Sequence, residues 1–147
     1  MIDQRTAPYA ALLLRLALGL LFIVHIYWKF AIFGFDTWLS RLQDAGYSMP
    51  VVIYVLCAEF AAALLLIPGI LTRWVSLFAL PLLLGASQFW LVRTGFFFTV
   101  SGAEFPMLWG LALIVQALLG DGAYALGLPW RRGSVTKPLS ATNTRMT

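Results

Sequence analysis

Four long apolar runs follow one another along this sequence, each separated from the next by polar or turn-forming residues. They cover approximately residues 9–33, 51–70, 74–92 and 105–119. A helix needs roughly 20 apolar residues to cross a bilayer core of about 30 Å, so the first three runs are long enough and the fourth is short. Because the runs are continuous and not alternating, they predict helices and not the strands of a barrel.

The composition places these runs in a membrane. Of the 147 residues, 61% are hydrophobic and 11% are charged, and the mean hydropathy is +0.87. A soluble domain carries about 25% charged residues, so a soluble monomer of this composition could not cover its surface with polar groups. We therefore expect a single all-α membrane domain over residues 1–147, built as an antiparallel four-transmembrane-helix bundle. The basic tail, approximately residues 131–147, is expected to be flexible.

The distribution of Lys and Arg predicts the orientation of the bundle. An even number of spans puts both termini and the connection between the second and third spans on one side. That side holds Arg5, Arg15, Arg73, Arg131, Arg132, Lys137 and Arg145, and the other holds Lys29, Arg41 and Arg93. The positive-inside rule therefore predicts cytoplasmic termini. The net charge of +4 reflects this topology and contact with anionic lipid, and no nucleic-acid partner is expected because no soluble basic domain is present.

A short segment over residues 35–46 connects the first two runs. Asp36 near its start and Gly46 at its end are typical of helix boundaries. Its larger apolar residues recur at the spacing of one helix face: Phe35, Trp38, Leu39 and Leu42. This pattern predicts an amphipathic helix on the outer surface of the membrane.

Ionisable side chains interrupt the runs, where a charge costs roughly 2.5–3.5 kcal/mol at the centre of a span. At about 100° per residue, Lys29 lies about 40° and His25 about 80° around the first helix from Arg15. These residues share one face, and Gly19 beside them permits close approach of another helix. The second helix enters from the outer side, which places Glu59 about 12 Å deep at a rise of about 1.5 Å per residue.

We expect the polar residues of the outer half of the bundle to converge. Arg93 ends the third span there, and Glu104 begins the fourth. Together with the residues on the first and second helices, the expected cluster is His25, Lys29, Glu59, Arg93 and Glu104. Glu59 is the deepest member, and Arg15 lies nearer the cytoplasmic side.

Each of these residues also has a purely structural interpretation. Lys29 can extend to the interface, and Arg93, like Arg15, can mark a membrane boundary. His25 can be a hydrogen-bonded core residue and Glu59 a neutral acid bonded to a neighbouring helix. Glu104 can be an acid that is stabilised by the N-terminus of its own helix. The common depth of the five residues favours a functional cluster.

A Glu–His–Lys cluster can bind and pass protons, which suits a quinone head group with two carbonyl oxygens that takes up two protons on reduction. Aromatic side chains nearby suit a flat ring, although aromatic residues are common at membrane interfaces. They are Tyr27, Trp28, Phe30, Phe60, Phe89, Trp90 and Trp109. One histidine and one cysteine, without short ligand spacing, lead us to expect no metal or haem. Cys57 alone cannot support thiol–disulfide chemistry within the chain, and we expect it to be a packing residue.

Three blocks of sequence carry a family resemblance. The first is Arg15-Leu16-Ala17-Leu18-Gly19-Leu20 followed by His25 and Lys29. The second is Ala58-Glu59-Phe60 followed by Leu65-Leu66-Ile67-Pro68-Gly69-Ile70-Leu71-Thr72-Arg73. The third is Gly102-Ala103-Glu104-Phe105-Pro106 with Gly120-Asp121-Gly122-Ala123-Tyr124. In this order they resemble the DoxX family of small four-helix membrane proteins. Ile26 departs from the family's Gly after the histidine, and Asp121 departs from its usual Pro.

The resemblance implies a multi-pass protein of a bacterial-type inner (plasma) membrane with a role in redox metabolism, since relatives include a subunit associated with thiosulfate:quinone oxidoreduction. We therefore predict an accessory subunit that works with quinone and a soluble or secreted oxidoreductase, because the chain has no obvious electron carrier of its own. Glu59 and His25 would exchange protons. Lys29, Arg93, Glu104 and Arg15 would hold charge or bind the ligand.

A second hypothesis is non-enzymatic. In it, the bundle binds or transports a small hydrophobic molecule, scaffolds a partner complex, or simply anchors one. A homo-oligomer is compatible with either hypothesis.

Overall fold

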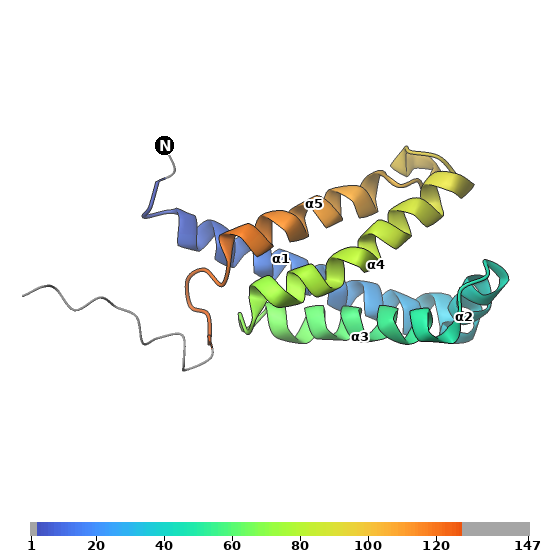
Figure 1. Ribbon diagram of the computed structural model, residues 1–147, viewed down its shortest axis with the longest axis horizontal. Helices are drawn as coiled ribbons and strands as arrows, with labels where there is room; N and C mark the ends of the chain where they lie inside the picture. Colours follow the sequence, from blue (N-terminus) through green and yellow to red (C-terminus); the bar gives the residue numbers. More distant parts are fainter. Residues whose placement is uncertain (1–2, 128–147) are drawn as a thin grey trace, which may run out of the picture.

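The computed structural model describes residues 3–127, and in this part of the chain it is an all-α bundle. The predicted flexible tail over residues 131–147 lies outside the described residues. Four long helices form the bundle: α1 (Ala7–Tyr27), α3 (Met49–Leu66), α4 (Thr72–Arg93) and α5 (Glu104–Leu119) (Figure 1). A π-helix (Trp28–Gly34) and α2 (Phe35–Asp44) connect α1 to α3, and a 3-10 turn (Phe98–Val100) precedes α5. These bounds agree with the four predicted runs to within a few residues.

The lengths of the helices identify a multi-pass membrane protein. Among the described residues, three helical segments are long and apolar enough to cross a membrane: Ala7–Asp44, α3 and α4. The fourth, α5, is apolar but has only 16 residues, as the short fourth run predicts. Large apolar side chains point outward from these helices, among them Leu64, Val92 and Leu118, which are 67%, 77% and 75% exposed. Lipid is the solvent that such a surface requires.

The chain connections lie at two opposite ends of the bundle (Figure 1). At one end, which we call the Arg15 end, the start of α1 and the α3–α4 turn meet the segment that follows α5. Backbone bonds from Ala123 N to Pro8 O, at 2.9 Å, and from Leu126 N to Pro68 O, also at 2.9 Å, hold these parts together. The opposite end, which we call the α2 end, contains α2 and the α4–α5 connection.

Glycines end the helices at both connections of α3. Gly46, with φ +83, follows α2, and Gly69, with φ +75, follows α3. At each position two bonds close the helix in the same way: the glycine N–H and the next N–H donate back to the carbonyls of the last turn. This is the Schellman arrangement, in which the left-handed residue is favourable for glycine. Asp36, by contrast, does not cap α2, because Gly34 precedes the helix and no side-chain cap bond forms.

The core lies where all four long helices meet. Leu18 and Phe22 of α1 pack with Leu66 of α3 and Leu113 of α5, and each of these side chains is at most 1% exposed. The predicted close approach at Gly19 is confirmed: a Cβ there would lie 2.6 Å from Ile67 Cγ1 at the end of α3. This apolar core separates the polar groups of the Arg15 end from those of the α2 end.

Candidate functional site

A buried ion pair lies between α3 and the helix that continues α1. Lys29 Nζ donates a hydrogen bond of 2.5 Å to Oε2 of Glu59, and the two side chains are 1% and 3% exposed. Of the face predicted for the first helix, Arg15, Gly19 and Lys29 are buried, whereas His25 is half-buried. Two opposite charges thus neutralise each other in the interior, where an unpaired charge would be strongly unfavourable.

His25 completes this cluster from the edge. Its Nε2 lies 3.7 Å from Oε1 of Glu59, which is an ion-pair distance and longer than a hydrogen bond. The imidazole is held by aromatic rings: Trp28 stacks on it at 5.9 Å, and Trp109 meets it edge-on at 5.8 Å, both between ring centroids. With a side chain 42% exposed, His25 is the member of the cluster that can exchange protons with its surroundings.

A π-helix carries Lys29 into this position. The segment Trp28–Gly34 has the wider i→i+5 pattern, which occurs mostly as short stretches and frequently at functional sites. Gly34 ends it with φ +88 and turns the chain into α2. As a result Trp38 of α2 folds back over the cluster, and Lys29 Nζ lies 4.0 Å from the centroid of its ring. A cation over an indole face is a favourable contact.

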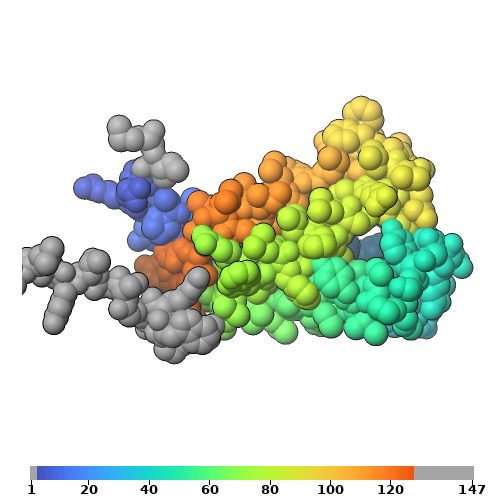
Figure 2. Space-filling model, in the orientation of Figure 1, coloured from blue at the N-terminus to red at the C-terminus, as the bar shows by residue number. Residues whose placement is uncertain are grey.

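The Lys29–Glu59 pair lines a cavity of about 350 Å³ at the α2 end. In Figure 2 the molecule is hollowed there, between α2 and the end of α4. All five α-helices contribute side chains to the lining, and most of these side chains are apolar. The polar or titratable groups of the lining are His25, Lys29, Arg41, Tyr47, Tyr54 and Glu59. A mostly apolar cavity with a few convergent polar groups is typical of a small-molecule site.

The aromatic lining agrees in part with the sequence expectation. Four of the predicted rings line the cavity: Trp28, Phe89, Trp90 and Trp109. Tyr27, Phe30 and Phe60 are not among the lining residues, and their exposed fractions are 62%, 44% and 43%. A membrane helix presents aromatic residues to lipid as readily as to a cavity, so residue type alone does not separate the two groups.

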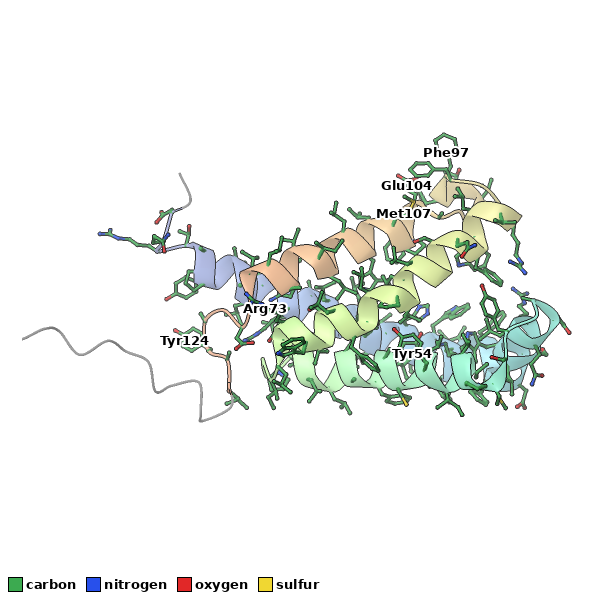
Figure 3. The ribbon with its side chains drawn as sticks, viewed as in Figure 1. Tyr54, Arg73, Phe97, Glu104, Met107 and Tyr124 are labelled. Carbon is green, nitrogen blue, oxygen red and sulfur yellow. The ribbon has the colours of Figure 1, made fainter. Side chains whose placement is uncertain are left out.

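Arg93 and Glu104 also lie at the α2 end but are not among the residues that line the cavity. The guanidinium of Arg93 stacks on the Phe89 ring at 3.8 Å, and its Nη1 donates to Phe89 O at 3.3 Å. Glu104 Oε2 accepts a 3.1 Å bond from Phe98 N. Figure 3 places Glu104, the first residue of α5, near Phe97 of the α4–α5 connection and away from Tyr54. Both residues therefore make local contacts outside the cluster.

Arg15 lies at the opposite end of the bundle, with the apolar core between it and Glu59. Its Nη1 donates to Asp121 O at 2.5 Å and its Nη2 to Ala123 O at 3.0 Å. Asp121 also accepts a 3.2 Å bond from Thr72 N through its carboxylate. The buried guanidinium therefore clamps the segment after α5 onto α1, and the Asp121 carboxylate connects the same segment to the start of α4. The structure thus divides the predicted site residues into one cluster of three and three residues placed elsewhere.

Sequence reasoning did not include Trp38, Arg41, Tyr47 and Tyr54 among the site residues, although all four line the cavity. Trp38 and Leu42 belong to the apolar face of the amphipathic segment, which the sequence pattern predicts to lie on the membrane surface. In the structure these two residues line the cavity together with Arg41. The helical spacing therefore indicated a face that becomes half-buried, but the pattern does not say what the face covers. Tyr54 on α3 donates a 2.6 Å bond to Phe78 O, in the turn of α4 before Pro81.

The arrangement can bind a flat, largely apolar molecule and present it with proton donors and acceptors. Lys29 supplies an ammonium group, Glu59 a carboxylate and His25 an imidazole, all at one side of an aromatic cavity. Within the described residues, no group of three His, Cys, Asp or Glu side chains comes together as a metal site. Proton exchange and hydrogen bonding are therefore the chemistry that these side chains provide.

Comparison with known proteins gives one match. A family model described as DoxX matches residues 10–100, which is more than half of the chain. That range includes most of α1 and all of the π-helix, α2, α3 and α4, and so contains His25, Lys29 and Glu59. No curated protein and no solved structure matches the chain.

Proposed function

The chain belongs to the DoxX family, and from this premise we propose that it is a membrane subunit of a redox system that binds a quinone in the cavity at its α2 end. The observation that carries the proposal is the buried Lys29–Glu59 pair in the wall of an aromatic cavity. Ionisable residues are expensive inside a membrane, and those that persist there mark binding sites and proton pathways.

The size and lining of the cavity support a ring-shaped ligand. Its volume of about 350 Å³ falls within the range of small-molecule sites. Trp109 of α5 and Trp38 of α2 line it together with Phe89 of α4, so aromatic faces approach from three helices. Such rings bury a large apolar area and stack on a flat partner.

Each side chain of the cluster has its own role in binding the quinone or in moving protons. Lys29 donates a hydrogen bond to a carbonyl oxygen of the ligand, in place of part of its present contact with Glu59. Glu59 takes up a proton when Lys29 turns to the ligand, and His25, at 3.7 Å from Glu59 and partly exposed, passes that proton to and from the cavity mouth. The electrons come from a soluble or secreted oxidoreductase, so the chain acts as an accessory subunit.

We also propose an orientation of the bundle in the membrane. The Arg15 end carries Arg5, Arg15 and Arg73, and the sequence after it adds Arg131, Arg132, Lys137 and Arg145. The α2 end carries Lys29, Arg41 and Arg93, so the positive-inside rule assigns the Arg15 end to the cytoplasm of a bacterial-type inner membrane. The cavity then opens near the outer side, with α2 at that surface. A secreted or outer-facing partner would meet the cavity there.

The proposal is tested by extracting purified protein in a mild non-ionic detergent and measuring bound quinone by mass spectrometry. Three forms are compared at matched folding: wild type, Glu59→Gln and Glu104→Gln. Glu104→Gln is the control, because it makes the same chemical change at an acid that does not line the cavity. We expect stoichiometric quinone in wild type and Glu104→Gln, and at least a tenfold loss in Glu59→Gln.

Equal trace amounts of quinone in all three forms would remove the support for the proposal. The cavity would then belong to a binding or scaffolding protein, and the Lys29–Glu59 pair would be structural. That outcome leaves family membership and fold unchanged, because neither depends on the ligand.

A further inference from the structure

The cavity contains one positive charge that no acid balances. Its charged lining residues are Lys29, Glu59 and Arg41, and the first two form the buried ion pair. Among the described residues, Arg41 has no acidic group within the ion-pair distance of 4.0 Å. Asp36 and Asp44, its acidic neighbours on α2, are exposed and are not among the lining residues. With His25 neutral, the lining has a net charge of one positive unit.

Arg41 is held in a way that leaves its donors available. Its guanidinium carbon lies 4.7 Å from the centroid of the Phe33 ring, another residue of the lining. The contact is made with a ring that takes no hydrogen bond from it in the structure, and Arg41 is exposed, so its N–H groups can meet two oxygens of one acid. The ring contact therefore orients Arg41 without consuming its hydrogen-bonding capacity.

We propose that Arg41 forms an anion subsite of this cavity, so that the cavity takes, besides a quinone, single-chain amphiphiles whose acidic group binds Arg41 and whose apolar body lies among the aromatic rings. The inference rests on the cavity being a ligand site, as proposed above, and adds that the site selects by charge. A volume of about 350 Å³ is at the lower end of the range for ligand sites, which favours one chain or ring over a two-chain lipid.

The test uses tryptophan fluorescence, because Trp28, Trp38, Trp90 and Trp109 line the cavity. Brominated dodecanoate and brominated dodecanol, which differ in charge but share an apolar chain, are titrated into the protein in non-ionic detergent at low salt. We expect the carboxylate to quench at about tenfold lower concentration than the alcohol, as a charge-assisted hydrogen bond allows. Added salt should reduce this preference.

Two arginine variants make the test specific. Arg41→Gln should abolish the preference for the carboxylate, whereas Arg41→Lys should keep part of it. Arg93→Gln is the matched control, because Arg93 also stacks on a phenylalanine ring at the α2 end but does not line the cavity. Arg93→Gln should behave as wild type.

Equal quenching by the carboxylate and the alcohol in wild type would overturn the inference, as would equal losses in Arg41→Gln and Arg93→Gln. Full displacement of the quencher by acetate at equal concentration would indicate a site for free anions and would overturn the amphiphile assignment. Quinone retention depends on Glu59 and the charge preference on Arg41, so the failure of one proposal is distinguishable from the failure of the other.

Discussion

Lys29 Nζ and Glu59 Oε2 lie 2.5 Å apart, and this contact joins the continuation of α1 to α3 across 30 residues of sequence. Both side chains are almost completely buried, at 1% and 3% exposure. Removal of one partner therefore leaves the other as an unpaired charge in the interior. The energetic consequence is large, whether or not the cavity binds a ligand.

We predict that Lys29→Met lowers the free energy of unfolding by about 3–5 kcal/mol, because Glu59 remains buried without its cation. The measurement is equilibrium unfolding in mixed micelles with a denaturing detergent. The double variant Lys29→Met/Glu59→Leu removes both charges and should recover most of the loss. Equal instability of the single and double variants would show that packing of the lysine stem, and not the charge, is the main contribution.

A second prediction concerns the turn between α3 and α4. Gly69 has φ +75, and a Cβ there would collide with the guanidinium of Arg15 and lie 2.8 Å from Ala125 Cβ. Gly69→Ala should therefore lower the free energy of unfolding by about 1–3 kcal/mol through backbone strain, with further loss from the displaced Arg15 clamp. Thermal unfolding in detergent measures the change.

Gly85→Ala is the control for that substitution. Gly85 lies inside α4, and a Cβ there would meet nothing within 4 Å. Alanine is a better helix former than glycine by about 1 kcal/mol, so stability should stay equal or rise. A comparable loss of stability in both variants would contradict the role assigned to the Gly69 turn.

A third prediction concerns the orientation in the membrane. In a Cys57→Ala background, single cysteines are introduced as Ser40→Cys in α2 and as Arg5→Cys near the start of α1, two exposed positions at opposite ends of the bundle. A membrane-impermeant maleimide applied to intact cells should label the first and leave the second unlabelled until the membrane is permeabilised. The reverse pattern would place the cavity on the cytoplasmic side.

The four long helices were predictable from hydropathy, but the course of the chain between α1 and α3 was not. The angles between Arg15, His25 and Lys29 hold for a regular α-helix, yet from Trp28 the chain is a π-helix, and Gly34 then turns it into α2. The amphipathic pattern of α2 identified a face that seeks an apolar environment. Because a membrane interface and an aromatic cavity both satisfy that pattern, Trp38 and Arg41 could not be assigned to the cavity from sequence.

The candidate site was recognisable only in part for a similar reason. Depth along each helix correctly placed His25, Lys29 and Glu59 near one another, and it placed Arg93 and Glu104 at the same end. However, the depth of a residue along a helix does not determine in which direction its side chain points around the helix axis. Arg93 and Glu104 therefore lie at the expected end but make local backbone contacts outside the cavity.

Helix positions in this protein follow from local properties of the chain, since a span must bond its own backbone and present apolar side chains over a fixed thickness. The pairing of polar groups has no such local cause. Lys29 finds Glu59 at a separation of 30 residues, and Arg15 finds Asp121 at a separation of 106. Such contacts exist only once close packing at positions such as Gly19 has set the distances and rotations between helices. The cavity is the space that this packing leaves at the α2 end, so tertiary structure alone determines which side chains surround a ligand.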